Sequence, residues 1–189
     1  MSRPPEALRA PRLLRPLELV GRALLDLPRW ARWIPSACWM GLIFVLSMQE
    51  FGVPGSGPSG IAWGIASNGY HCFEFGLLAL FLCVFLPREA GWPRLEARQR
   101  GWILLAVLLY AASDEWHQVY VPSRNASVLD LASDLVGAWI ALRAARRVGG
   151  PHADAAHLAR IVAWGIPLCL ASAALAHWLP QCFPDAAWM

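Results

Sequence analysis

The sequence predicts an all-α integral membrane protein, a compact bundle of about five transmembrane helices that follows a basic N-terminal cytoplasmic segment. Of its 189 residues, 57% are apolar and 15% are charged, whereas a soluble domain carries about 25% charged residues. The apolar residues fall into five long runs. Tryptophan occurs 11 times, and indole rings are enriched at both membrane–water interfaces.

We expect three units along the chain: a basic Arg/Pro-rich segment (1–32), a four-helix transmembrane domain (33–145), and a region with a cytoplasmic linker, an additional transmembrane helix and a short external tail (146–189). The first unit has no apolar core long enough for a signal peptide. Within it, Ala7–Leu27 is compatible with a basic amphipathic helix on an anionic membrane surface. A partly disordered tail that only sets the orientation explains the same composition, so both interpretations stand.

Each of the five apolar runs is expected to be helical, because lipid offers the backbone no hydrogen-bond partner. Their lengths are close to the ~20 residues that cross a ~30 Å hydrocarbon core, and the first run is the shortest. The predicted spans are Trp33–Gln49, Asn68–Leu86, Gly101–Val119, Ser127–Ala145 and Ala159–Leu179.

The arginines predict the orientation of the protein, since basic residues favour cytoplasmic loops. Seven precede or enter the first run, the loop 50–67 has none, and four lie between the second and third runs. Arg124 alone follows the third run, four follow the fourth, and the end of the chain has none. This alternation predicts a multi-pass protein with its N-terminus in the cytoplasm and its C-terminus outside. The arginines flank apolar runs and are not interleaved with exposed aromatic residues, so we expect no nucleic-acid partner.

Three of the predicted spans carry polar side chains in their outer halves. These are His71 and Glu74 in the second span, Asp114, Glu115 and Gln118 in the third, and Asp130 and Asp134 in the fourth. At 1.5 Å per residue, Glu74, Asp114 and Asp134 each lie ~10 Å inside the outer boundary. A charge at that depth costs about 2.5–3.5 kcal/mol even on insertion scales, so it usually has a partner and a function. We therefore expect a ligand-binding site formed by these residues together with Arg124 of the following loop.

Several of these positions also have a structural interpretation. Ser127 and Asp130 have the spacing of a capping box, so Asp130 could serve only to complete a helix start. His117 and Tyr120 are typical interfacial residues. The role of Gln118 could be limited to an interhelical hydrogen bond.

The balance of charge in this region bears on what it binds. Five acids would face one fixed cation, Arg124, with His71 and His117 as optional ones. Carboxylates packed together repel one another, so the site holds protons, binds a metal ion or an ammonium group, or is packed more loosely. A purely structural network of the acids with Arg124 and His71 is a further alternative. Carboxylate oxygens suit Mg²⁺, Ca²⁺ or Mn²⁺ and histidines admit Zn²⁺, so the cofactor stays undetermined, with a divalent metal as one option.

The five cysteines show neither CxxC spacing nor a zinc-binding pattern. Cys38, Cys83 and Cys169 fall in or beside apolar runs, where cysteine packs as a small apolar residue. Cys72 and Cys182 would both lie on the outer side in this topology, so a disulfide between them is left open.

Four features follow one another along the chain. They are His71 near the start of a span, Asp114-Glu115-Trp116-His117-Gln118 closing another, the loop Pro122-Ser123-Arg124, and Asp130 with Asp134 and Gly137 in the next. Together they resemble the VanZ-like membrane proteins, over about Ile34 to Leu142, the first four predicted spans. The usual outline of that family has four spans, so the N-terminal extension and the run Ala159–Leu179 are additions.

The resemblance carries expectations about location more than about chemistry. The family is named after a protein encoded with glycopeptide-resistance genes and linked to teicoplanin resistance. The resemblance implies a bacterial inner-membrane protein connected to the cell envelope, but it does not imply a particular reaction. Gly137 would allow a close approach between helices.

Three functions are consistent with these residues. The one we favour is a non-catalytic envelope protein whose outward acidic site binds a lipid-linked cell-wall precursor or a glycopeptide, and so contributes to envelope maintenance or antibiotic resistance. Arg124 would contact phosphate or carboxylate, and the acids would hold amine or hydroxyl groups. The second is an intramembrane enzyme acting on envelope lipid or peptidoglycan precursors, with His71 or Glu115 as general base. The third is a small proton-coupled transporter or a subunit with a membrane-protein partner, although no inverted repeat is visible.

Overall fold

The computed structural model describes residues 11–49, 58–121 and 126–182, and these residues are almost entirely helical. The helices are α1 (Arg15–Leu25), α2 (Ile34–Ser47), α3 (Pro58–Leu82), α4 (Ala97–Gln118), α5 (Val128–Val148) and α6 (Ala155–Cys182), with short 3-10 turns at Arg12–Leu14, Cys83–Phe85 and Gly150–His152. Two short antiparallel strands, β1 (Arg88–Glu89) and β2 (Trp92–Pro93), form a hairpin. The predicted all-α class is confirmed.

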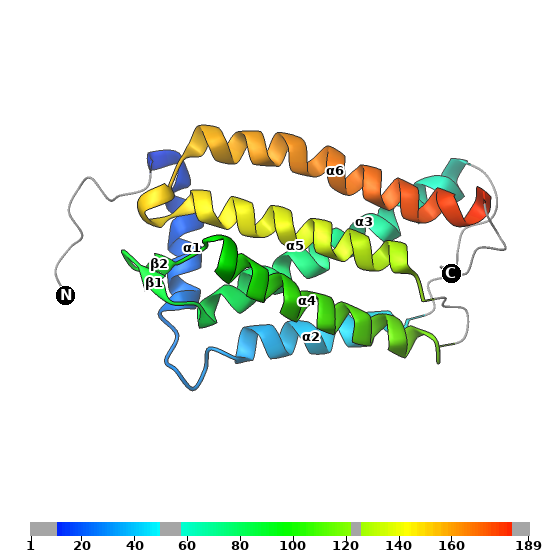
Figure 1. Ribbon diagram of the computed structural model, residues 1–189, viewed down its shortest axis with the longest axis horizontal. Coiled ribbons are helices and arrows are strands. Elements are labelled where there is room, and N and C mark those ends of the chain that lie inside the picture. Colours follow the sequence, from blue (N-terminus) through cyan, green and yellow to red (C-terminus); the bar gives the residue numbers. More distant parts are fainter. Residues whose placement is uncertain (1–10, 50–57, 122–125, 183–189) are drawn as a thin grey trace.

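The helices form a bundle in which α2, α4, α5 and α6 run alongside one another, with α3 passing among them (Figure 1). α1 lies across one end of the bundle, beside the β-hairpin (Figure 1). The most extensive helix–helix contact joins α3 to α5, and α6 packs on both. The bundle therefore brings the second, fourth and fifth predicted spans into direct contact.

Two glycines let α3 and α5 approach each other closely. A Cβ on Gly137 would overlap the backbone of Cys72, and a Cβ on Gly76 would lie 3.2 Å from the Gly137 carbonyl oxygen. Phe75 and Leu78, on α3 beside this crossing, are fully buried. Small residues at a helix interface allow backbones to come together, so the close approach expected at Gly137 is confirmed.

Three helices begin earlier than the sequence predicted; one of them, α4, begins at Ala97 and not at Gly101. α3 begins at Pro58 and not at Asn68, and proline fits the first turn of a helix because its missing N–H needs no partner there. α6 begins at Ala155 and not at Ala159, because the Asp154 carboxylate accepts the His157 backbone N–H at 2.9 Å. The same bond holds the pKa of Asp154 below its usual value.

Two described segments are long and apolar enough to cross a membrane: Gly60–Phe85, which is most of α3 with the turn after it, and α6. α2 is apolar but shorter. Large apolar side chains are exposed along these helices, among them Phe73, Trp164 and Leu170. Exposed apolar surface of this kind is typical of a protein that faces lipid or a partner. The full set of five spans stays a prediction.

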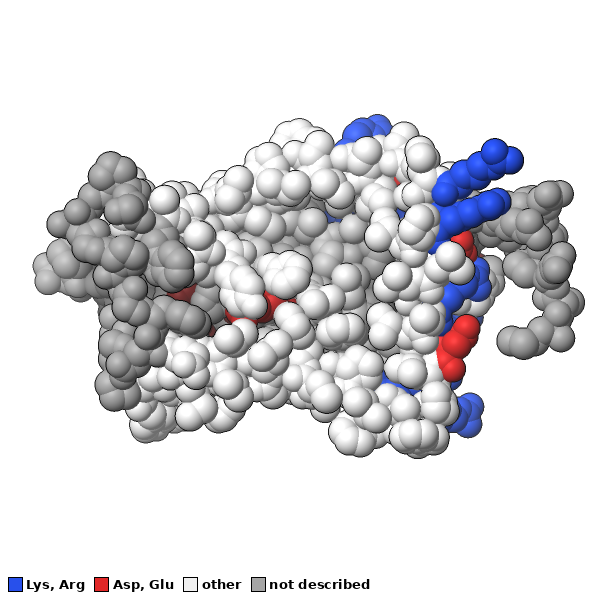
Figure 2. Space-filling model, turned by 180° about the vertical axis from the view of Figure 1, so that it is seen from behind, with Lys and Arg blue, Asp and Glu red and all other residues white. Residues whose placement is uncertain are grey.

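The basic residues gather at one end of the bundle. Seen from behind, arginine side chains lie at the end where α1 is found, and the flank in view is largely free of charge (Figure 2). α1 is an amphipathic helix, with Leu19 and Val20 exposed and Leu25 buried against the bundle. The helical interpretation of Ala7–Leu27 therefore holds for its described part; residues 7–10 lie outside the described residues.

Trp92 in the hairpin holds α1 and the end of α5 together. Its ring is buried with Leu25 of α1 and Val148 of α5. Its indole N–H donates to the Ala145 carbonyl oxygen at 2.9 Å. The ring lies so close to Gly149 that a Cβ there would be 2.7 Å away. This cluster therefore packs α1, the hairpin and the end of α5 together at the Arg-rich end of the bundle.

Candidate functional site

Polar side chains of α3, α4 and α5 come together inside the bundle, in the half away from the arginines. Figure 2 shows acidic atoms among uncharged side chains in that half. We call this group the polar layer; its members are His71, Glu74, Asp114, Glu115, Gln118, Asp130 and Asp134. All of them except His71 and Asp130 are buried. Arg124, the cation expected in the same site, lies outside the described residues.

His71 of α3 and Asp134 of α5 make the contact that joins these two helices in the polar layer. His71 Nδ1 lies 3.3 Å from Asp134 Oδ1, and Asp134 is only 1% exposed. Glu74 and Asp130 lie near enough to act on His71 electrostatically. A carboxylate beside an imidazole orients the ring. His71 of the second predicted span and Asp134 of the fourth are thus neighbours.

Asp114 and Gln118 form a pair within α4. Gln118 Nε2 donates to Asp114 Oδ2 at 3.0 Å, as the spacing of four residues allows. The other carboxylate oxygen, Asp114 Oδ1, is buried and has no hydrogen-bond partner among the described residues. The bond that Gln118 makes lies within one helix, in contrast to the interhelical bond that the sequence left open.

Glu115 fixes the start of α5. Its Oε2 accepts the backbone N–H of Ser127 at 2.6 Å. Ser127 Oγ in turn accepts the N–H groups of Leu129 and Asp130, at 3.2 and 3.4 Å. In a capping box the acid three residues downstream would receive the first N–H, but here an acid from α4 does so. Glu115 therefore positions α5, and Ser127 caps it.

Aromatic residues of α2 close one side of the polar layer, and the sequence did not single them out. Trp39 Nε1 donates to the Glu74 carbonyl oxygen at 2.8 Å, which joins α2 to α3. The ring centroids of Phe44 and His117 lie 4.4 Å apart. His117 thus packs against α2, which the interpretation as an ordinary interfacial residue did not include.

Several buried polar atoms in and around the layer have no hydrogen-bond partner within the described residues. They belong to Ser47, His71, Asp114, His117, Ser133 and Asp134. His71 and Asp134 have only their 3.3 Å contact with each other. Buried polar atoms are nearly always hydrogen-bonded, and one left unsatisfied costs about 1–3 kcal/mol. Such a concentration is typical of a place that a ligand, an ion or water completes.

Ser133 is a further site residue that the sequence analysis missed. It is fully buried in α5, next to Asp134, and its hydroxyl oxygen lacks a partner among the described residues. It follows Asp130 by three residues, a spacing that places both on one face of the helix. That spacing is the signal that could have identified it.

The described part of the chain holds no group of three or more His, Cys, Asp or Glu side chains arranged for a metal ion. His71 and Asp134 would supply two ligands at most from their contact, and divalent ions in proteins take four or more ligands. The described residues thus lack a complete, preformed metal site.

The disulfide left open between Cys72 and Cys182 is not formed. Both residues are free thiols. The Cys72 thiol is buried and donates to the Ser133 carbonyl oxygen at 3.2 Å. Cys72 therefore contributes to the contact between α3 and α5.

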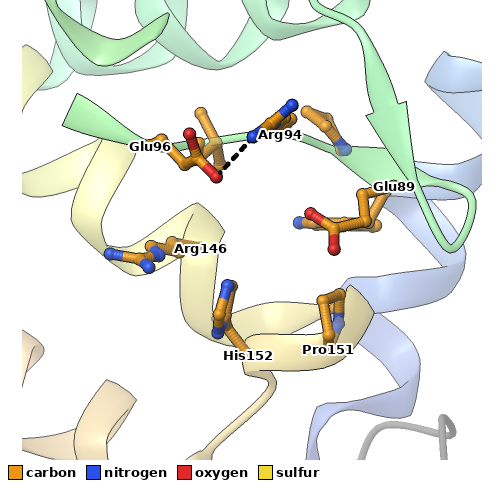
Figure 3. A pocket seen from close by; sticks show the side chains of 10 residues that line it. Glu89, Arg94, Glu96, Arg146, Pro151 and His152 are labelled. Atoms are coloured by element: carbon orange, nitrogen blue, oxygen red, sulfur yellow. Dashed lines mark hydrogen bonds and ion pairs between the residues drawn. The ribbon is translucent and has the colours of Figure 1, made fainter. Parts of the chain in front are cut away.

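A small pocket lies at the Arg-rich end, beside Trp92. Its lining includes Glu89, Arg94, Glu96 and Arg146, and Arg94 pairs with Glu96 at 2.9 Å (Figure 3). Its volume of about 10 Å³ admits about one water molecule. This pocket is therefore a packing feature and not a candidate ligand site.

The described residues form a helical bundle that encloses a polar site, and two of its segments are long and apolar enough to cross a membrane. The family model VanZ/LLP1 matches residues 32–148, more than half of the chain. The chain belongs to the VanZ/LLP1 family, as its motifs predicted. No curated protein and no solved structure matches the chain in the two other comparisons.

Proposed function

We propose that this protein resides in the bacterial inner membrane, where its polar layer binds a cell-envelope ligand and so contributes to envelope maintenance or glycopeptide resistance. The supporting observation is the concentration of buried polar atoms on α3, α4 and α5 that lack partners among the described residues. A ligand that donates hydrogen bonds would satisfy them. Membership of the VanZ family, which is linked to teicoplanin resistance, supports a ligand from the envelope.

The charges of the layer favour a ligand with amine and hydroxyl groups. Asp114 Oδ1 and Asp134 Oδ1 are buried acceptors, and ammonium or hydroxyl donors match such acceptors in strong, charge-assisted hydrogen bonds. Glycopeptides and lipid-linked cell-wall precursors both carry groups of this kind. In this proposal Arg124 contacts the phosphate or carboxylate of the same ligand.

We further propose that α2 to α6 cross the membrane, with the Arg-rich end in the cytoplasm and the polar layer nearer the outer face. The gathering of arginines at one end (Figure 2) agrees with the cytoplasmic bias of basic residues. Asp114, Glu115 and Asp134 are buried in the bundle, where intramembrane acids are tolerated. α1 would then lie along the cytoplasmic surface with Leu19 and Val20 in the interface.

The proposal is tested by the glycopeptide susceptibility of a sensitive Gram-positive host that expresses the protein. Asp114→Asn, Asp134→Asn and Arg124→Ala are compared with the wild type at matched membrane levels. Arg94→Gln, which alters an exposed ion pair at the opposite end, is the control. We expect the wild type and Arg94→Gln to protect against teicoplanin, and the three site variants to lose protection. Protection that survives all three site substitutions contradicts the proposal.

An intramembrane enzyme is the second candidate, and one contact favours it. An imidazole beside a carboxylate is an arrangement suited to general acid–base chemistry, and His71 and Asp134 have it at 3.3 Å. Glu115, the other candidate base, already accepts the Ser127 N–H. Envelope lipids altered by the wild type but not by His71→Gln, as measured by mass spectrometry, would support catalysis. An unchanged lipid profile in cells protected from teicoplanin would support binding alone.

A further inference from the structure

A groove runs along the outside of the bundle between α5 and α6. Its volume is about 600 Å³, and none of its lining residues belongs to the polar layer. Its floor lies where the two helices are close: a Cβ on Gly165 would be 2.7 Å from Ile140. Its walls are apolar and include Trp139 of α5 and Trp164 and Leu168 of α6. The groove is therefore a second concave surface, independent of the candidate site.

One end of this groove is basic. Arg143 of α5 and His157 and Arg160 of α6 line it, and no acid does. The Arg143 guanidinium lies over the Trp139 ring, 4.7 Å from its centroid, in a cation–π contact that holds the charge at the edge of the groove. Among the described residues, neither arginine forms an ion pair with a carboxylate. Two arginines thus line the basic end of an otherwise apolar groove.

We propose that this groove binds one anionic phospholipid, with its phosphate between Arg143 and Arg160 and an acyl chain along Trp164 and Leu168. Basic pockets between transmembrane helices at the cytoplasmic side recognise anionic headgroups. From Arg160 to Ala171, the last lining residue along the chain, α6 rises ~16 Å at 1.5 Å per residue, enough for much of one acyl chain. Charge at one end and apolar surface along the rest is the pattern of a phospholipid.

This inference rests on the membrane placement proposed above and not on the envelope ligand. With the Arg-rich end in the cytoplasm, the lipid belongs to the inner leaflet, whose surface is anionic. A second groove, between α4 and α5, provides an internal reference. It has a volume of about 490 Å³ and is lined only by apolar residues, such as Leu105, Leu135 and Trp139. The binding of lipid in this second groove is not expected to depend on the charge of the headgroup.

The test is lipid retention by the purified full-length protein in detergent, measured by native mass spectrometry. The probes are dioleoylphosphatidylglycerol, which is anionic, and dioleoylphosphatidylcholine, which is not. The variant Arg143→Gln/Arg160→Gln removes both groove arginines. The control Arg94→Gln/Arg98→Gln removes two exposed arginines of the same end that do not line the groove. We expect the wild type and the control to retain one phosphatidylglycerol in preference to phosphatidylcholine, and the groove variant to bind it ~30-fold more weakly.

Each other outcome overturns the proposal. A wild type without preference for phosphatidylglycerol, or equal losses in both double variants, shows that no specific site exists. Displacement of the lipid by millimolar inorganic phosphate assigns the arginines to a free anion. A dimer that disappears in the groove variant assigns the groove to a second copy of the chain.

A second variant tests the groove without changing its charge. Its result therefore does not depend on any effect of the arginine substitutions on folding. Ala171→Trp narrows the far end of the groove, where residue 171 is exposed. We expect it to weaken retention of phosphatidylglycerol while leaving the thermal stability of the protein unchanged; full retention contradicts the placement of the acyl chain. Because the readout is lipid mass on purified protein, loss of teicoplanin protection in cells has no bearing on it.

Discussion

His71 Nδ1 and Asp134 Oδ1 lie 3.3 Å apart across the interface between α3 and α5. Gly137 lies three residues after Asp134 in α5. The two helices approach closely there, because a Cβ on Gly137 would overlap the Cys72 backbone. The Cys72 thiol bonds to the Ser133 carbonyl oxygen in the same interface. Close backbone packing and the buried polar contact are thus parts of one helix pair, and both are open to direct test.

His71→Ala is expected to lower the free energy of unfolding by about 1–3 kcal/mol, because the buried Asp134 carboxyl loses its partner. Thermal unfolding of the purified protein in detergent measures this, with His152→Ala at the exposed end as the control. The double variant His71→Ala/Asp134→Ala should cost less than the sum of the single variants. Additive losses would show that the two side chains do not interact.

Gly137→Ala is expected to destabilise the protein by about 1–3 kcal/mol, since the added methyl group would force α3 and α5 apart. Gly41→Ala is the matched control: it also lies within a helix, and a Cβ there meets nothing within 4 Å. The control should be neutral or slightly stabilising, because alanine has the better helix propensity. Equal melting temperatures for the two variants would contradict the close crossing.

Trp92→Phe is expected to cost about 0.5–1.5 kcal/mol, because it removes the hydrogen bond to the Ala145 carbonyl oxygen. It should also speed limited proteolysis near α1, which Trp92 holds to the bundle. Trp164→Phe serves for comparison, since Trp164 is 78% exposed. The interpretation of Trp92 as the residue that holds this end together fails if both variants are cleaved at the same rate.

Glu115→Ala is expected to destabilise the start of α5 by about 0.5–2 kcal/mol, the range found for the loss of a hydrogen bond at a helix N-terminus. Glu115→Gln retains an oxygen that accepts the Ser127 N–H and should lose much less. Hydrogen exchange at Ser127 and Leu129 reports the effect locally. If the glutamine variant exchanges as fast as the alanine variant, the negative charge matters more than the position of the oxygen.

A reporter enzyme fused after Met189 is expected to be active outside the cytoplasm, because the five proposed spans would place the two ends of the chain on opposite sides. Alkaline phosphatase, which needs an oxidising compartment to form its disulfides, is a suitable reporter. The same enzyme fused after Arg94, at the Arg-rich end, should be inactive and serves as the control. Activity after Arg94 and none after Met189 would reverse the proposed orientation.

Much of the candidate site could be predicted from spacing along each helix. The intervals between His71 and Glu74, and between Asp130 and Asp134, already placed each pair on one helical face. Gly137 was expected to permit a close approach, and the structure confirms it. The pairing of His71 with Asp134 could not be read from intervals, because it depends on how α3 and α5 are rotated about their axes.

By itself the sequence determined the all-α class, the family and the order of the apolar segments. The all-α class and the order of the apolar segments follow from local composition and periodicity, and the family follows from the resemblance of the polar motifs to the VanZ-like proteins. Only the tertiary structure decided which groups meet: the Glu115 carboxylate accepts the Ser127 N–H at the start of α5, and Trp39 donates to the Glu74 carbonyl oxygen. It also decided that a groove with Arg143 and Arg160 forms between α5 and α6. The physical reason is that these contacts join residues distant in sequence, so they depend on the rotation and crossing of packed helices.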